Sequence, residues 1–225
     1  MEGIFVAAHE LKSPLALVRQ LALSLDPNDP YDVSDSRAKL VAVSERALRQ
    51  VSDLAKLSRL DDGLFTMEPV AIRSVVQSVR HDLSPLFSES SRQLDVSFTN
   101  RSKLVIANYD LLSSILYNFC SNAVKYSAPG TISHLSVRDH RSRVRVSVRD
   151  FGPALPTSLY RLLNADAPLA APVTIAPRPD SSGLGLFIST HFARFMHAQI
   201  GAIRHRDGVS FFVDLPISQQ ASLFS

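Results

Sequence analysis

The stretch FVAAHELKSPLAL, residues 5–17, places one histidine, His9, on an amphipathic helix beside the carboxylate of Glu10. Apolar residues recur through residues 4–25 at alternating spacings of three and four, which predicts a helix whose apolar stripe packs against other helices. His9 lies just off that stripe, among small or polar neighbours, so a partner protein could reach its imidazole. Because Pro14 cannot donate a hydrogen bond to the carbonyl of Glu10, we expect the helix to bend there.

A second helix with the same spacing is expected after the loop Asp-Pro-Asn-Asp-Pro at residues 26–30. Ser34 or Asp35 can cap this helix, and the sequence Asp-Asp-Gly at residues 61–63 ends it. Two such helices form a hairpin with an apolar stripe too exposed for a monomer. We therefore expect residues 1–62 to be a dimerisation domain that pairs with a second copy as a four-helix bundle.

From residue 66 onward, helices and mostly antiparallel strands alternate, which predicts an α+β fold: a two-layer α/β sandwich over residues 66–217, followed by a tail at 218–225. Helices are expected over residues 71–87, 110–126 and 184–197, and strands over residues 93–98, 104–107, 132–138, 143–150, 200–206 and 209–215. Residues 163–180 are rich in proline and alanine and show no periodicity, so we expect a functional lid there.

Composition excludes several classes of protein. An apolar fraction of 45% over 225 residues supports a proper core, and no apolar run is long enough for a membrane segment or fits a signal peptide. We therefore expect a cytoplasmic location. The arginines of residues 143–149 alternate with valines and lack interleaved aromatics, so they predict a strand with one wet face and no nucleic acid partner. Cys120 is expected to be a buried structural thiol, and a lone cysteine excludes a disulfide or zinc framework.

Polar residues on the helix expected over residues 110–126 suit a magnesium triphosphate. Asn118, Asn122 and Lys125 are one and two turns apart and line one face. An asparagine carbonyl is a hard oxygen ligand for magnesium, and a lysine supplies a point charge to phosphate. The alternative is an ordinary solvated helix face.

Two glycine-containing motifs follow. Asp150 and Gly152 end a valine-rich strand, where the carboxylate can accept a hydrogen bond from an adenine amino group and the glycine allows close backbone approach. Gly183 and Gly185 open a helix, and free N–H groups at a helix N-terminus bind phosphate. Arg178 precedes them and either reaches a γ-phosphate from the lid or is an exposed loop arginine.

Taken together, these motifs resemble those of two-component sensor histidine protein kinases. His9 and Glu10, followed by Lys12, Ser13 and a Pro-Leu pair, resemble the phosphoacceptor box, where Thr or Asn usually stands in place of Ser13. Residues 118–126 resemble the N box, 150–152 the first glycine box, 183–186 (GLGL) the second glycine box and 208–211 the closing box, in the family's order. The chain departs from the pattern at Pro153, where the first glycine box has a glycine, and residues 159–162 (LYRL) replace the phenylalanine-containing lid motif.

The resemblance implies a dimerisation and histidine phosphotransfer domain followed by an ATP-binding domain of the GHKL (Bergerat) type. It implies a protein-histidine kinase that phosphorylates His9 from Mg-ATP and passes the phosphoryl group to an aspartate of a response regulator receiver domain. The catalytic residues would be His9, Glu10, which orients the imidazole and takes up its other proton, and Ser13, which holds a water near a phosphoaspartate. The nucleotide residues would be Asn118, Asn122, Lys125, Tyr126, Asp150, Gly152, Arg178, Gly183, Leu184 and Gly185, with Asn122 also holding Mg²⁺.

Two alternatives remain open at this point. One is a degenerate, non-catalytic dimeric scaffold for signalling, and the other is an ATPase of the same GHKL fold. An upstream sensory part, missing from this chain, could tether the full-length protein to a membrane.

Overall fold

The structure is a computed structural model that describes residues 2–26, 28–99, 104–165, 167–173 and 183–218. Within these ranges the side chains of residues 2–11, 13 and 30 lie outside the description. The chain divides into two compact units, Met1–Arg59 and Leu60–Ser225. Among the described residues, no helix combines the length and the apolar character needed to cross a bilayer.

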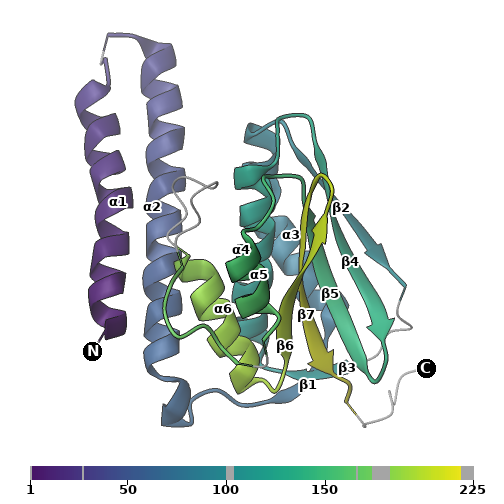
Figure 1. The fold of residues 1–225 in the computed structure, drawn as a ribbon. Coiled ribbons are helices and arrows are strands. Elements are labelled where there is room, and N and C mark those ends of the chain that lie inside the picture. The colour runs from purple at the N-terminus through teal and green to yellow at the C-terminus, as the bar shows by residue number, and fades with distance from the viewer. Residues whose placement is uncertain (1, 27, 100–103, 166, 174–182, 219–225) are drawn as a thin grey trace. The chain divides into compact units, whose positions relative to one another are not determined.

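The first unit is a hairpin of two long helices, α1 (Glu2–Ser24) and α2 (Pro30–Ser58), which run antiparallel to each other (Figure 1). Helix α1 continues through Pro14. Helix α2 begins earlier than predicted, because Asp29, and not Ser34 or Asp35, is its cap. The Asp29 carboxylate accepts hydrogen bonds from the backbone N–H groups of Tyr31 (2.9 Å) and Asp32 (3.4 Å). A proline at the first helical position has no N–H to satisfy, so Pro30 starts the helix instead of ending the loop.

The hairpin leaves much of its apolar surface in solvent. Among its described side chains only that of Ser36 is fully buried. Large apolar side chains are exposed along both helices: Leu15, Leu17, Leu23, Tyr31, Val41, Leu48 and Val51. Two helices by themselves therefore provide no closed core.

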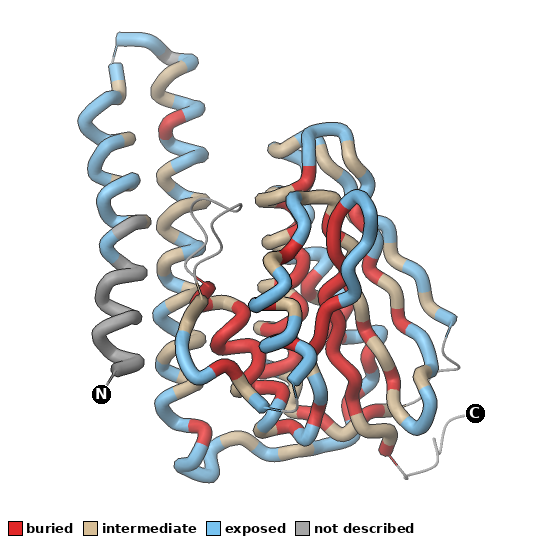
Figure 2. The backbone as a smooth tube through the Cα atoms, viewed as in Figure 1, coloured by how far each residue is buried: buried red, intermediate tan, exposed pale blue. Residues whose placement is uncertain are grey.

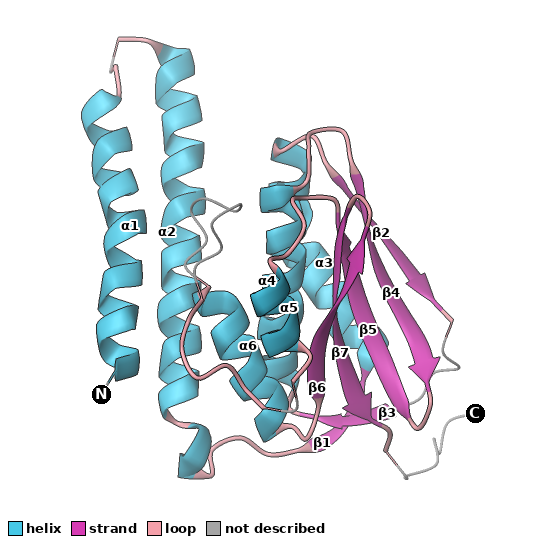
Figure 3. Cartoon of the chain, viewed as in Figure 1, coloured by secondary structure: helices cyan, strands magenta, loops and turns pink. Residues whose placement is uncertain are grey.

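The second unit is a two-layer α/β sandwich, which confirms the predicted α+β fold (Figure 3). Its helices are α3 (Ile72–Glu89), α4 (Tyr109–Tyr126), α5 (Thr157–Leu163) and α6 (Leu184–Phe195), with a short 3-10 turn at Leu60–Asp62. Its strands are β1 (Glu68–Ala71), β2 (Gln93–Phe98), β3 (Leu104–Ala107), β4 (Ile132–His140), β5 (Arg143–Asp150), β6 (Gln199–His205) and β7 (Gly208–Pro216). The main sheet has the order β2-β4-β5-β7-β6 and is antiparallel except for the β2–β4 pair, and β1 pairs with β3 separately.

The core lies between the main sheet and helices α3, α4 and α6 (Figure 2). On β5, Val144, Val146 and Val148 have no exposed surface, whereas Arg143 and Arg145 on the other face are half-buried. This alternation confirms the predicted strand with one wet face.

Two short elements were not predicted. Helix α5 has seven residues with Leu159 and Leu163 buried, and strand β1 has four residues with only Val70 buried. Neither is long enough to produce a periodic apolar pattern. The expected helix over residues 184–197 ends at Phe195, because His197 takes a left-handed conformation with φ of 52°.

Cys120 lies on α4 with no exposed surface, as predicted for a structural thiol. Burial raises the pKa of its thiol to about 12, because the thiolate would lose its hydration.

One ion pair joins β5 and β7 on the wet face of the sheet. The Arg145 guanidinium donates two hydrogen bonds to the Asp214 carboxylate, at 2.7 and 2.6 Å, and lies 3.7 Å from the centre of the Phe212 ring. Asp214 is almost completely buried. A second pair, Arg149 with Asp207, has a mostly exposed carboxylate.

We expect Asp214→Ala to lower the free energy of unfolding of this unit by about 2–3 kcal/mol, because it leaves the Arg145 charge largely buried without a partner. Urea unfolding measures the loss. The matched control Asp207→Ala removes an exposed partner and should cost less than about 1 kcal/mol. Equal losses in the two variants would contradict the assignment of a buried, structural ion pair.

Candidate functional site

A chain of polar side chains joins helix α4 to the start of helix α6. Asn118 donates from Nδ2 to the hydroxyl of Ser189 at 3.0 Å, and Ser189 donates to the carbonyl of Gly185 at 2.8 Å. Asn122 donates from Nδ2 to Oδ1 of Asn118 at 3.4 Å. Two of the predicted site residues on α4 are thus connected to the second glycine motif.

The close approach of these two helices depends on glycine at position 185. A β-carbon there would overlap the carboxamide oxygen of Asn118. Gly183, just before the helix, has φ of 72°, and a β-carbon there would overlap the backbone of Val173. Because Gly185 has no side chain, the N-terminal end of α6 lies close to α4. The free N–H groups at this end of the helix can stabilise an anion such as phosphate.

The first glycine motif packs against the other end of α4. Asp150, at the end of β5, has no exposed surface, and its carboxylate accepts a hydrogen bond from the backbone N–H of Gly152. A β-carbon on Gly152 would lie 2.5 Å from Cβ of Tyr126 and 2.8 Å from its carbonyl oxygen. The backbone N–H of Phe151 donates to the hydroxyl of Ser127 at 3.0 Å. These contacts fix the buried carboxylate beside the C-terminal end of α4.

The closing motif packs against the backbone of the same residue, Asp150, from the neighbouring strand. Gly208 begins β7 with φ of 140°, and a β-carbon there would overlap the carbonyl oxygen of Asp150. Pro153, the departure from the first glycine motif, is exposed.

The arrangement brings together three kinds of polar group: a helix N-terminus, a buried carboxylate and half-buried carboxamides. In the part of the chain that the structure describes, the carboxamide oxygen of Asn122 has no hydrogen-bond partner. Such an oxygen suits a hard cation that also binds phosphate oxygens. The described residues hold no cluster of three or more His, Cys, Asp or Glu side chains that could bind a metal by themselves. Lys125, also half-buried, has its ammonium 5.3 Å from the centre of the Tyr126 ring.

Some predicted site residues cannot be placed in this arrangement. Arg178 lies outside the described residues. His9, Glu10 and Ser13 lie on α1, in the other unit, and their side chains are outside the description.

Two residues that the sequence reasoning missed hold the site together. Ser189 bridges Asn118 and Gly185, and Ser127 binds the backbone after Asp150. Ser189 is four residues after Gly185 in a mostly apolar helix, and this isolated polar residue was the available signal.

Comparison with known proteins identifies the family of the second unit. Residues 107–219 match the family described as histidine kinase-, DNA gyrase B- and HSP90-like ATPase. The sensor protein SphS of Synechococcus elongatus is 27% identical over 96% of this chain and 54% of its own length, so the chain spans about half of that relative.

Two solved structures share the fold. The Acinetobacter baumannii histidine kinase AdeS superposes with a TM-score of 0.65 at 18% identity, over 94% of this chain and 98% of that one. The histidine kinase ThkA in complex with the response regulator protein TrrA superposes with a TM-score of 0.62 at 14% identity, over 96% of this chain and 61% of that one.

A domain of the matched family binds ATP. A helix N-terminus is a group that can bind phosphate, and a carboxylate can accept a hydrogen bond from an adenine amino group. The chain therefore belongs to the histidine kinase-, DNA gyrase B- and HSP90-like ATPase family.

Proposed function

We propose that this chain is a histidine kinase core that transfers the γ-phosphoryl group of ATP to His9 and then to an aspartate of a response regulator receiver domain. The contact that carries the proposal is the one between Asn118, Ser189 and Gly185, which joins two motifs that lie far apart in the sequence. It supports nucleotide binding in a chain that also carries the phosphoacceptor motif around His9.

The second unit holds the nucleotide. The Asp150 carboxylate accepts a hydrogen bond from the adenine amino group, beside Gly152. The N–H groups that follow Gly183 bind phosphate oxygens, and the carboxamide oxygen of Asn122 binds Mg²⁺. Lys125 adds positive charge near the phosphates. Phosphoryl transfer needs this positioning and charge neutralisation more than it needs covalent help from the protein.

The first unit supplies the acceptor. A ring nitrogen of His9 attacks the γ-phosphorus, the bond to the bridging oxygen breaks, and ADP leaves with the electron pair. Glu10 takes up the proton from the other ring nitrogen. The regulator's aspartate then attacks the phosphorus, the bond between phosphorus and the ring nitrogen breaks, and Glu10 returns the proton to the other ring nitrogen, so that His9 leaves as neutral imidazole. Ser13 holds a water that hydrolyses the regulator's phosphoaspartate. Because acceptor and nucleotide residues belong to different units, these must meet during the reaction.

A homodimer and a response regulator are the proposed partners. The apolar side chains exposed on α1 and α2 favour a second copy of the hairpin as the missing half of a four-helix bundle. The complex of ThkA with TrrA supports a regulator as the second partner, because ThkA shares this fold. We place this part of the protein in the cytoplasm, where the regulator and ATP are available.

One alternative has a specific observation in its favour. Pro153 and the unusual lid residues 159–162 are what a non-catalytic dimeric scaffold would tolerate. The exposed position of Pro153 favours the kinase.

The other alternative is a GHKL ATPase, which would release phosphate without labelling the protein.

Substitution of His9 in the first unit and of Asn122 in the second should abolish different steps: labelling of the protein and magnesium-dependent binding of ATP. We expect His9→Ala to bind Mg-ATP normally but to acquire no label from γ-labelled ATP. Asn122→Ala should lose at least about tenfold in magnesium-dependent affinity, the cost of one metal ligand, while keeping the acceptor intact. His81→Ala, an exposed histidine on α3, is the matched control and should be labelled normally. Acid-stable label, or label that persists in His9→Ala, would remove His9 from the mechanism.

A β-carbon at position 185 should weaken nucleotide binding without unfolding the domain. We expect Gly185→Ala to displace the Asn118 carboxamide and to weaken ATP binding by about tenfold or more, equivalent to the loss of about one charge-assisted hydrogen bond. Isothermal titration calorimetry measures the affinity. Gly130→Ala is the matched control, because it adds a β-carbon in open space with φ of 80° and should reduce stability but not affinity. Unchanged affinity in Gly185→Ala would exclude the proposed site.

The exposed stripe predicts the oligomeric state. Light scattering at micromolar concentration should give the mass of a homodimer. Leu48→Glu on α2, where Leu48 is 69% exposed, should shift the protein towards monomer, because each apolar side chain buried in a bundle contributes about 1.5–3 kcal/mol. Leu162→Glu is the control, since Leu162 is exposed on α5 of the other unit. A folded monomer would contradict the four-helix bundle.

A further inference from the structure

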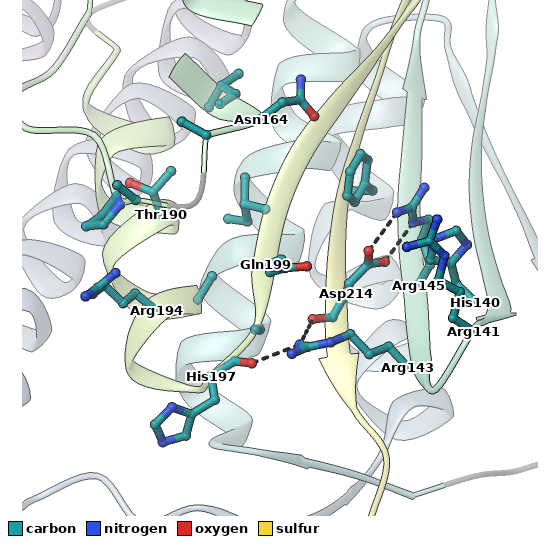
Figure 4. A pocket seen from close by; sticks show the side chains of 18 of the residues that line it. His140, Arg141, Arg143, Arg145, Asn164, Thr190, Arg194, His197, Gln199 and Asp214 are labelled. Atoms are coloured by element: carbon teal, nitrogen blue, oxygen red, sulfur yellow. Dashed lines mark hydrogen bonds and ion pairs between the residues drawn. The ribbon is translucent and has the colours of Figure 1, made fainter. Parts of the chain in front are cut away.

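A pocket of about 920 Å³ lies in the second unit, away from the nucleotide residues. It is formed by the turn between β4 and β5, the edge strand β6 with β7 beside it, the C-terminal end of α6 and the segment after α5 (Figure 4). None of the residues assigned above to the nucleotide or to the acceptor lines it. A volume of this size is typical of sites for small organic ligands.

The charges that line this pocket are unbalanced. Its described lining has four arginines, Arg141, Arg143, Arg145 and Arg194, and a single carboxylate, Asp214. That carboxylate is already taken, because Arg145 donates two hydrogen bonds to it. Among the described lining residues, the other three guanidinium groups therefore give an excess of positive charge.

Much of the hydrogen-bonding capacity of these three arginines is unused. In the described part of the chain, the side chains of Arg141 and Arg194 form no hydrogen bond or ion pair with protein groups; both residues are exposed and donate to solvent. Arg143 uses only Nη1, which donates to the carbonyls of His197 (2.9 Å) and Asp214 (3.2 Å). Its Nε and Nη2 groups make no such contact with described residues, so they remain as donors for a ligand.

The backbone at two points of the pocket wall takes a conformation that glycine usually provides. Arg141, in the β4–β5 turn, has φ of 55°, and His197, after α6, has φ of 52°. Glycine or asparagine is usual at both kinds of position, and another residue costs about 1 kcal/mol or more. Arg143, two residues after Arg141, donates a hydrogen bond to the carbonyl of His197. The backbone conformation by itself would favour glycine over Arg141 and His197, so local stability does not explain these two residues.

The cations are not gathered at one point. Figure 4 shows Arg194 on α6 on one side of strand β6, and Arg141 and Arg143 on the other side. Apolar side chains also line the pocket, among them those of Ile200 and Phe212. A ligand that matches this pattern carries two separated anionic groups on an apolar body, since guanidinium groups pair with phosphate or carboxylate oxygens.

We propose that this pocket binds a small organic dianion in which a ring or short apolar segment separates two phosphate-like groups. The proposal does not depend on the kinase activity proposed above. It gives a binding role to the arginine-bearing face of β5, which the sequence predicted only as solvent-exposed.

The test uses a matched series of probes: 1,4-phenylenebisphosphonate, benzene-1,4-dicarboxylate and phenylphosphonate. Amide NMR spectra are recorded on the whole chain with the nucleotide site saturated by Mg-ATP. We expect the bisphosphonate to shift the signals of residues 140–145 and 193–200, and the mono-anion to bind about tenfold more weakly, because it engages only one wall. The dicarboxylate should bind between these two; if it binds more tightly than the bisphosphonate, the phosphate-like assignment is overturned.

Variants then locate the site. Arg141→Gln and Arg194→Gln should each weaken bisphosphonate binding by about tenfold, the loss of one charge-assisted contact. Arg138→Gln is the matched control, because Arg138 is exposed on β4 opposite Arg145 but does not line the pocket, and it should bind normally. Equal weakening in all three variants, shifts only around Asn118 and Gly185, or no binding at millimolar concentration would overturn the proposal.

Discussion

The contact between α4 and α6 is the constraint on which the rest of the second unit depends. With glycine at position 185, the Asn118 carboxamide can lie against the backbone of α6 and donate to Ser189. Any side chain at position 185 would separate the two helices. The N-terminal end of α6 would then move away from the amides of α4, and these are the two groups that we propose hold the triphosphate.

The sheet supports this contact through the alternation of its side chains. The valines of β5 fill the core below α4, and the same strand ends in Asp150, whose carboxylate is carried to the C-terminal end of that helix. On the opposite face Arg145 pairs with Asp214 of β7, and Arg143 and Arg145 line the second pocket. The alternation of side chains along β5 thus places valines in the core, Asp150 at the buried end of the strand and arginines on the opposite face.

The two units differ in how completely they satisfy their own apolar surface. The sandwich buries a continuous set of side chains, including Phe119, Phe192 and Phe211, and needs no partner for its core. The helical hairpin leaves Leu23 75% exposed and Leu48 69% exposed. An element that has no core of its own gains stability from association, so the unit that carries the proposed acceptor motif is also the one that we propose pairs with a second copy.

The sequence by itself determined the elements that repeat regularly and the order of the motifs. The alternating valines and arginines predicted β5, and the spacing of Asn118 and Asn122 predicted one polar helix face, since both are properties of a single element. Only the tertiary structure decided that Asn118 meets Gly185, that Asp29 caps α2, and that four separate segments enclose a basic pocket. Periodicity is local, whereas these contacts depend on how closely distant backbones pack, and elements as short as β1 and α5 leave no periodic signal.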